Sequence, residues 1–255
     1  MLNHSLTHAA FFSVTDPEIL KPVIDALQIL EIISTCFHKD LFPQVEAQIG
    51  QTCSLLSHRV RGIRHMASRC LAVWASLMPE CVMPTVARTI VPRLGSEDPI
   101  TRQGAIEAIW CIVDRLGLGL LPYIVLLVVP VLGRMSDMNT YVRMLASLTF
   151  ATLVRLMPLE GGVPDPKSLP ADLIQQKGEQ RMFLEQLLDP SKIPKYEISV
   201  PIRAELRPYQ QSGVNWLGFL NKFKLHGILS DDLGLGELCM KIMLVEFGFG
   251  TNVCG

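Results

Sequence analysis

Apolar stretches long enough to form helices alternate with short polar turns between residues 16 and 158. Residues 82–94 and 100–116 form one pair of predicted helices, joined by residues 95–99. Within this turn Pro99 suits the first helical turn, where its missing N–H group would have no partner in any case. Asp98 and Asp137 stand where an N-cap or turn residue is expected. The pattern therefore predicts paired helices.

The helix pairs recur at a regular spacing. Equivalent positions are separated by 38 and then by 41 residues, as in the arginines Arg64, Arg102 and Arg143 and the alanines Ala67, Ala105 and Ala146. A period near forty with two helices per unit is typical of an α-solenoid of the HEAT type. We therefore predict an all-α domain over residues 1–158, with roughly three and a half repeats and the three alanines buried where helices stack.

A connector is predicted over residues 159–205. Eight of the 17 prolines fall between Pro158 and Pro208, and residues 161–166 make the sharpest break in the pattern. One amphipathic helix is predicted inside the connector over residues 172–188.

Composition narrows the class of protein. With 255 residues, 49% of them hydrophobic and 18% charged, the chain can bury a sizeable core in one or two domains. The net charge of −1 provides no overall basic field for nucleic acid. Seven cysteines without paired short spacings favour a reducing intracellular compartment over a disulfide framework or a zinc site. The scattered histidines predict no metal site.

The longest uncharged run, residues 116–133, predicts a buried helix and no membrane span. It contains Pro122, Pro130 and three glycines, and it barely reaches the length that a bilayer requires. Residues 1–14 lack the basic start and the cleavage site of a secretory signal.

One local basic cluster occurs, formed by Arg59, Arg61, Arg64 and Arg69. We interpret this cluster as a solvated helix face. The alternative is a docking patch for an acidic partner or for DNA phosphate. Large apolar side chains are predicted to fill the core; they are Trp74, Trp110, Met66, Met78, Met83, Met135, Met138 and Met144.

A short hydrophobic stretch, residues 227–229, leads into a glycine-containing loop, residues 231–236. In ATP-binding loops of this kind backbone amides hold the phosphates, a lysine pairs with the outer phosphates, and a hydroxyl group binds magnesium. Glu237 and Leu238 stand where that lysine and threonine belong. A carboxylate repels a triphosphate and leucine offers magnesium no oxygen, so the loop predicts weak nucleotide binding or none. A plain turn is the alternative.

Residues 206–217, LRPYQQSGVNWL, and residues 229–236, LSDDLGLG, resemble the first motifs of the SNF family of helicase-like ATPases. The resemblance ends at about Gly236. Residues 183–188 and 221–227 favour the branch of that family that removes TATA-binding protein from promoter DNA. The resemblance implies that Gln210 contacts adenine, and it assigns an ATP site to Gln210, Asp231, Asp232, Leu233, Gly234, Leu235, Gly236, Glu237 and Leu238.

The resemblance further implies ATP and magnesium as cofactors, TATA-binding protein as a partner, DNA as a second candidate partner, and a nuclear location. About fifty residues follow Pro201, too few for one lobe of such a motor, and no second carboxylate motif occurs among them. We therefore predict an incomplete α/β stub over residues 206–255, and a non-catalytic interaction protein. A working DNA-dependent ATPase module and a truncated product without a settled function are the alternatives.

Overall fold

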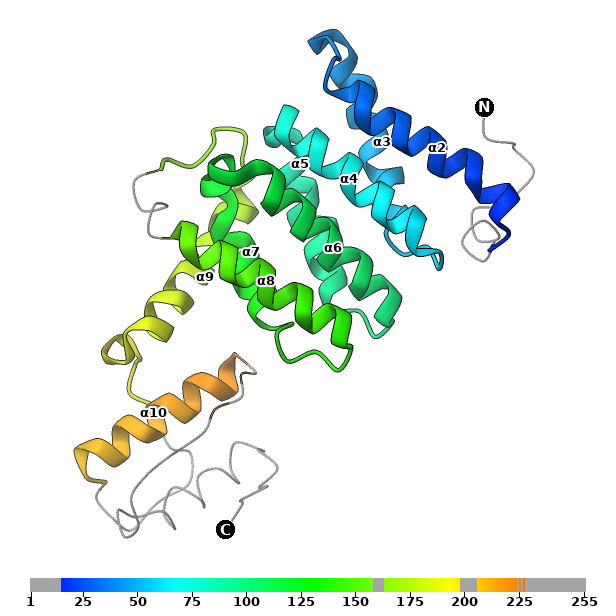
Figure 1. Ribbon diagram of the computed structural model, residues 1–255. Coiled ribbons are helices and arrows are strands. Elements are labelled where there is room, and N and C mark those ends of the chain that lie inside the picture. The colour runs from blue at the N-terminus through cyan, green and yellow to red at the C-terminus, as the bar shows by residue number, and fades with distance from the viewer. Residues whose placement is uncertain (1–14, 158–162, 198–205, 224, 226, 228–255) are drawn as a thin grey trace. The chain divides into compact units, whose positions relative to one another are not determined.

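The computed structural model describes residues 15–157, 163–197, 206–223, 225 and 227 (Figure 1). The α-helices in this part of the chain are α2 (Pro17–Ser34), α3 (Phe42–Leu55), α4 (Arg61–Leu77), α5 (Pro79–Thr85), α6 (Pro99–Leu116), α7 (Ile124–Leu132), α8 (Thr140–Leu156), α9 (Ala171–Leu188) and α10 (Pro208–Lys222). Shorter helical turns are η1 (Lys39–Leu41), η2 (Val86–Ile90), η3 (Val91–Gly95), η4 (Gly117–Tyr123) and η6 (Pro190–Lys192). These ranges contain no strand, which confirms the all-α fold class for them. The predicted α/β stub falls largely on residues 228–255, outside the described part.

The chain divides into two compact units, Met1–Arg181 and Met182–Gly255, and the division falls inside α9. The boundaries that we expected at residues 158 and 205 remain predictions.

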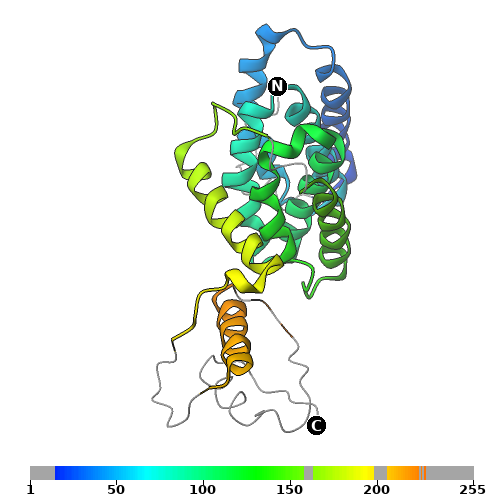
Figure 2. The same cartoon turned by 90° about the vertical axis from the view of Figure 1, so that its left-hand side faces the viewer.

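The first unit is a stack of helices in two layers (Figures 1 and 2). Helices α2, α4, α6 and α8 lie side by side in one row, each in contact with the next. Helices α3, α5 and α7 form the second layer and pack against this row. The order of the helices along the chain therefore matches the predicted repeat of helix pairs.

The repeat register correctly predicted three buried small side chains. Ala67, Ala105 and Ala146 are each 0% exposed, in α4, α6 and α8 respectively. Trp74 is also buried, and its indole Nε1 donates a hydrogen bond to Ser34 Oγ at 3.0 Å, which satisfies the polar end of the ring.

The methionine prediction was only partly right. Met78 and Met83 are buried, whereas Met138 and Met144 are 92% and 54% exposed. Both exposed methionines lie in or beside α8, the last helix of the row.

Local chemistry explains where the long helices begin. The carboxylate of Asp98 accepts hydrogen bonds from the backbone amides of Ile100 and Thr101 and caps α6, with Pro99 in the first turn. Asp137 is a turn residue. The N-cap of α8 is Asn139, whose side chain accepts from the amide of Val142.

Two predicted helices are interrupted. Residues 82–94 form the end of α5, a π-helical turn (η2) and a 3-10 turn (η3). Pro84 and Pro92 have no N–H group to continue the α-helical ladder, which is sufficient reason for the break.

Residues 116–133 are likewise divided, because Gly117 adopts φ 51°, a conformation that glycine accommodates without strain. The stretch Pro99–Leu132 has the length and hydropathy of a membrane span, and 44% of its most apolar window is buried. It is not one straight helix: α6 ends at Leu116, and α7 has 9 residues, which cover only about 14 Å of a bilayer core of about 30 Å.

The connector contains the expected helix, α9, within one residue of its predicted start. Lys177 on this helix is 2% exposed, and its ammonium group donates to the carbonyl of Pro122 at 2.9 Å and to Asp165 at 2.6 Å. Asp172 pairs with Arg88. These contacts hold the first half of α9 against the rest of the first unit.

Candidate functional site

Gln210 lies in the first turn of α10. Its Oε1 accepts a hydrogen bond from the backbone amide of Arg207 at 3.0 Å, and Pro208 occupies the first helical turn. The glutamine therefore fixes the start of the helix that carries it. The other residues of the expected ATP site, Asp231 to Leu238, lie outside the described residues, and that site stays a prediction.

One face of α10 binds Tyr196, a residue of the connector. Asn215 Oδ1 accepts from the backbone amide of Tyr196 at 2.8 Å, and Gln211 Nε2 donates to the carbonyl of Tyr196 at 3.2 Å and to Asn215 Oδ1 at 2.8 Å. Both backbone groups of one residue are thus satisfied by two side chains one helical turn apart. A Cβ atom at Gly218 would lie 2.5 Å from the Tyr196 ring, so the glycine allows the ring to lie on the helix.

This contact was not predicted from the sequence. Gln211, Asn215 and Gly218 share one helix face, but nothing in the local sequence indicates that Tyr196 would lie on it.

Aromatic rings pack on a neighbouring side of α10. Phe219 stacks on Phe183 with ring centroids 5.5 Å apart and on Trp216 at 5.4 Å. Phe223 lies 4.4 Å from Phe183 and 4.9 Å from Phe219. Because Phe183 belongs to the end of α9, these rings join the end of α9 to α10 within the second unit.

In the first unit the recurring arginines act on the backbone. Arg64, Arg102 and Arg143 are each the fourth residue of a helix, and each Nη1 donates to the carbonyls six and five residues earlier. These carbonyls belong to the turns that precede α4, α6 and α8. The guanidinium groups therefore satisfy turn carbonyls that the helices leave without partners.

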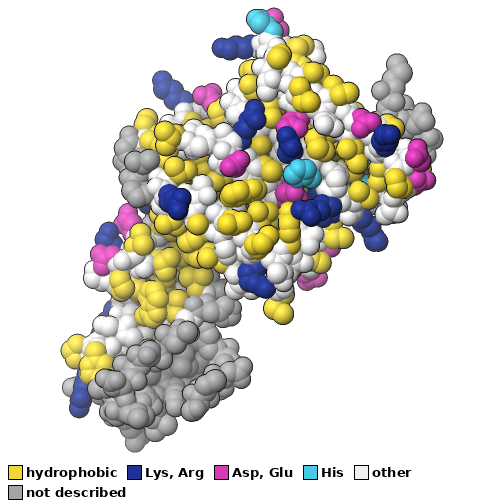
Figure 3. Space-filling view, in the orientation of Figure 1, with side chains coloured by type: hydrophobic (Ala, Val, Ile, Leu, Met, Phe, Trp, Pro, Cys, Tyr) yellow, Lys and Arg dark blue, Asp and Glu magenta, His cyan; other side chains and the backbone are white. Residues whose placement is uncertain are grey.

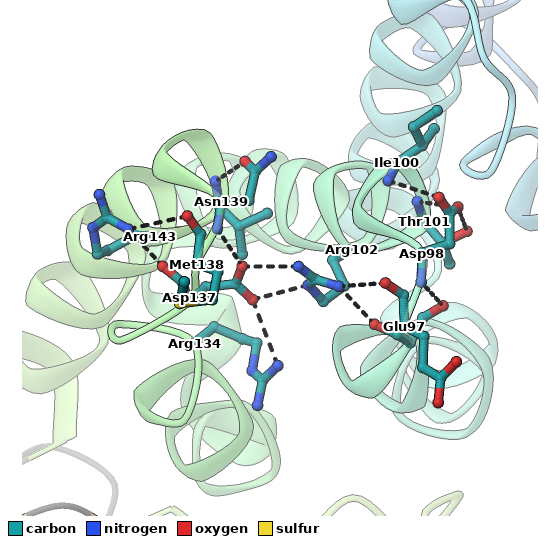
Figure 4. A network of polar contacts seen from close by, with 12 residues as sticks. Glu97, Asp98, Ile100, Thr101, Arg102, Arg134, Asp137, Met138, Asn139 and Arg143 are labelled. Atoms are coloured by element: carbon teal, nitrogen blue, oxygen red, sulfur yellow. Dashed lines mark hydrogen bonds and ion pairs between the residues drawn. The ribbon is translucent and has the colours of Figure 1, made fainter.

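Arg102 also joins two repeats (Figure 4). Its Nε and Nη2 donate to the two carboxylate oxygens of Asp137, at 2.9 and 3.0 Å, and Asp137 is 7% exposed. Burial would raise the pKa of Asp137, but the hydrogen bonds from Arg102 and from the amide of Asn139 outweigh it and hold that pKa below its usual value. The carboxylate is therefore structural in this network.

The basic cluster is mostly occupied by contacts within the protein. Arg64 is 4% exposed, Arg69 pairs with Glu31 at 2.8 Å, and Arg61 lies over the Tyr141 ring, 5.0 Å from its centroid. On the face formed by the row of helices, basic and acidic side chains lie among hydrophobic ones (Figure 3). The reading of Arg64 as part of a solvated face is wrong, because the turn before α4 binds it.

The described residues offer little for catalysis or metal binding. They contain no cluster of three or more histidine, cysteine, aspartate or glutamate side chains able to hold a metal ion. Burial raises the pKa of the Cys70 and Cys111 thiols to about 12, which keeps both protonated near neutral pH. This part of the chain presents a surface of packed helices and, in α10, the helix that carries Gln210.

No protein-family model matches the chain. Its sequence is 47% identical over 224 residues to human TATA-binding protein-associated factor 172, and 44% identical over 226 residues to TATA-binding protein-associated factor mot1 of Schizosaccharomyces pombe. These matches cover 88% of the chain but 12% of each relative. Helicase SWR1 of Debaryomyces hansenii is 34% identical over 82 residues, which is 32% of the chain and 5% of that relative.

The chain thus spans 12% of the length of the two factors that it matches over most of its own length. Identity of 44–47% over more than 220 residues goes well beyond the short motifs that first indicated the relationship. Over 88% of its length, the chain is therefore homologous to a segment of the TATA-binding protein-associated factors.

Proposed function

We propose that the chain is a non-catalytic helical-repeat segment of a nuclear transcription regulator, and that it binds TATA-binding protein. The observation that carries this proposal is the 47% identity to a TATA-binding protein-associated factor over 88% of the chain. The layered helices of the first unit support it, because stacked helix pairs present extended surfaces that usually serve protein partners. DNA is a second candidate partner, because 32% of the chain matches Helicase SWR1.

We also propose that the chain does not hydrolyse ATP, because of the residues at positions 237 and 238. Glu237 replaces the cation that would pair with the outer phosphates, and Leu238 replaces the hydroxyl that would bind magnesium. ATP and magnesium are therefore proposed as cofactors of related proteins and not of this chain. HEAT-type geometry of the repeats is likewise proposed from their period and their paired helices.

A binding titration tests the partner. Fluorescently labelled TATA-binding protein is titrated with the purified chain, and we expect saturable binding. Ala105→Arg, which places a charge where the side chain is 0% exposed, should abolish it, whereas Glu97→Arg at an exposed turn position should not. No binding by the natural chain up to about 100 µM, a free energy of only about −5 kcal/mol, would contradict the proposal.

A second candidate function, a DNA-dependent ATPase module, is favoured by the helix α10 with Gln210 in its first turn and by the match to Helicase SWR1. Nucleotide titration separates the two. The natural chain should bind ATP weakly or not at all, and Glu237→Lys with Leu238→Thr should bind it more tightly. Hydrolysis by the natural chain that is lost in Gln210→Ala would establish the ATPase instead.

A further inference from the structure

The residue two positions before the N-cap has the same role in three repeats. Its side chain accepts a hydrogen bond from the N-cap amide, through His58 Nδ1 at 3.1 Å, Ser96 Oγ at 3.2 Å and Asp137 Oδ1 at 2.8 Å. Its carbonyl accepts from Nη1 of the recurring arginine, which is Arg64, Arg102 and Arg143 respectively. His58, Ser96 and Asp137 are therefore equivalent positions, although their side chains differ.

Between α6 and α8 this position also joins neighbouring repeats. The carboxylate of Asp137 binds Nε and Nη2 of Arg102 at 2.9 and 3.0 Å (Figure 4). Shifting this pair back by one repeat places Ser96 opposite Arg64. A serine hydroxyl carries no charge and is shorter than a carboxylate, so it does not bind a guanidinium group in this way.

Arg64 shows what the α4–α6 junction lacks. Its side chain is 4% exposed, and its Nε is buried without a hydrogen-bond partner among the described residues. Its Nη2 donates to the neutral amide oxygen of Gln103 at 3.2 Å, whereas Arg102 uses both Nε and Nη2 for a carboxylate. A buried N–H group without an acceptor destabilises the fold. The anion that completes the α6–α8 junction is thus missing here.

The carboxylates near Arg64 do not supply that anion. Burial lowers the pKa of the Arg64 guanidinium, and the charges of Glu107 and Asp98 oppose this effect, so both carboxylates lie near it. Glu107 binds His65 through Oε1, and its Oε2 is buried without a partner among the described residues. Asp98 uses both of its oxygens to cap α6. The repeat itself places the missing charge at position 96.

A phosphoryl group on Ser96 would provide it. Phosphoserine carries a charge of about −1.5 to −2 at pH 7 and three acceptor oxygens. These oxygens lie one bond farther from the backbone than those of aspartate, so they reach a guanidinium group that the hydroxyl does not. The dipole of α6 favours a negative charge before its first turn. Glu97 and Asp98 would repel the phosphate, whereas Arg64 and Arg102 would attract it.

The turn around Ser96 is open to an enzyme. Ser96 is partly exposed, and the residues on both sides of it, Gly95 and Glu97, are exposed. Among the described residues its Oγ accepts a hydrogen bond from the amide of Asp98 and donates none. Modification of the hydroxyl therefore breaks no contact in which it is the donor.

We propose that Ser96 is a phosphorylation site, and that its phosphate binds Arg64 and joins the repeat of α4 to the repeat of α6. A protein kinase transfers the γ-phosphoryl group of ATP to Ser96 Oγ. The new Oγ–P bond forms as the bond from that phosphorus to the β-phosphate oxygen breaks, ADP leaves, and the hydroxyl proton passes to the base of the kinase. Hydrolysis by a phosphatase restores the serine, so the strength of this junction is reversible.

Two substitutions of similar size test the contact without a kinase. Ser96→Asp supplies a charge, whereas Ser96→Asn keeps an acceptor for the Asp98 amide but is neutral. Chemical denaturation of the full chain should give a folding equilibrium constant about tenfold higher for Ser96→Asp, the scale of one charge-assisted hydrogen bond. The matched control compares the natural chain with Glu97→Gln, an exposed charge in the same turn, and should differ less. Equal effects at both positions, or none at position 96, would overturn the proposal.

Phosphoserine introduced at position 96 during synthesis tests the contact directly. The second pKa of a free phosphoserine is about 6. Pairing with Arg64 should lower it by about one pH unit in the folded chain relative to the chain in urea, as measured by phosphorus NMR. Phosphoserine in place of the exposed Glu97 is the control and should shift less. An unshifted pKa at position 96 means that Arg64 does not bind the phosphate.

The modification itself is tested on the chain isolated from its natural source. Phosphopeptide mass spectrometry should find phosphate on Ser96. If the peptide that contains Ser96 is detected only in its unmodified form, Ser96 is not a phosphorylation site and the proposal is wrong, even where Ser96→Asp stabilises the stack.

Discussion

The guanidinium group of Arg102 in α6 meets the carboxylate of Asp137 through two hydrogen bonds of 2.9 and 3.0 Å, while its Nη1 binds the carbonyls of Ser96 and Glu97. One side chain therefore fixes the turn before its own helix and the turn before the next. Asp137 in turn accepts from the amide of Asn139, the N-cap of α8. The geometry of each repeat is thus tied to that of its neighbour.

Replacing Asp137 by asparagine should destabilise the first unit by about 2–4 kcal/mol, because a buried, charge-assisted and bidentate pair loses its anion. Chemical denaturation measures the change in the free energy of unfolding. Asp98→Asn is the matched control, since asparagine caps a helix about as well as aspartate. Equal losses for the two variants would show that the contact with Arg102 contributes nothing beyond capping.

Stability should fall as the pH is lowered below about 4, near the pKa of an unfolded aspartate. In the folded chain the pKa of Asp137 is lowered, since hydrogen bonds from Arg102 and Asn139 and the charges of Arg102 and Arg134 outweigh the effect of burial. The unfolded state therefore binds more protons in this range, and the stabilisation present at higher pH is lost as the pH falls through the folded pKa. Unfolding free energies between pH 3 and 7 should show a shallower slope for Asp137→Asn, and unchanged slopes would contradict this assignment.

Gly104→Ala should cost more than about 3 kcal/mol, because a Cβ atom there would lie 1.8 Å from the carbonyl oxygen of Leu56 and 3.2 Å from Arg64 Cδ. Backbone must move to relieve the first contact. Gly50→Ala in α3 meets nothing within 4 Å and should stabilise the helix by about 0.5–1 kcal/mol. Thermal unfolding of both variants compares the two sites. If Gly104→Ala leaves the stability unchanged, Gly104 does not lie close to the Leu56 carbonyl.

The repeat could be predicted from the sequence because its period constrains small side chains directly. Ala105 must fit between helices wherever the units stack, so alignment alone identified it as buried. The role of Arg64 could not be found by grouping it with nearby arginines, since burial depends on turn carbonyls that only the fold brings within reach. The recurrence of arginine at the equivalent positions 102 and 143 could have indicated this role, because an exposed position is not constrained to carry the same residue in each repeat.

Features that depend on distances between elements were not predictable. The need for Gly104 comes from the approach of α6 to Leu56, and the contact of Tyr196 with Asn215 joins residues 19 positions apart. The interruptions of the helices were partly predictable from the sequence. Pro92 indicated a break between residues 82 and 94, but the local apolar pattern suggested one continuous helix.

Thiol reactivity should separate Cys36 from Cys70. Cys36 is exposed, whereas burial, followed by the charge of Glu31, raises the pKa of Cys70 to about 12, and its Sγ donates to the carbonyl of Leu27 at 3.2 Å. At pH 8 the thiolate fraction of Cys70 is only about 10⁻⁴, so alkylation by iodoacetamide should be at least about 10³-fold slower than at Cys36. Peptide mass spectrometry measures each site separately.

Because reagent reaches Cys70 only when α2 and α4 separate, its labelling rate also reports opening of the first unit. Asp137→Asn, which lowers the stability of the stack, should therefore accelerate labelling of Cys70 and leave Cys36 unchanged. If Cys70 reacts as fast as Cys36 in the natural chain, the thiol is not enclosed between the two helices. If Asp137→Asn unfolds the chain more easily but leaves Cys70 labelling unaffected, α2 and α4 open independently of the rest of the row.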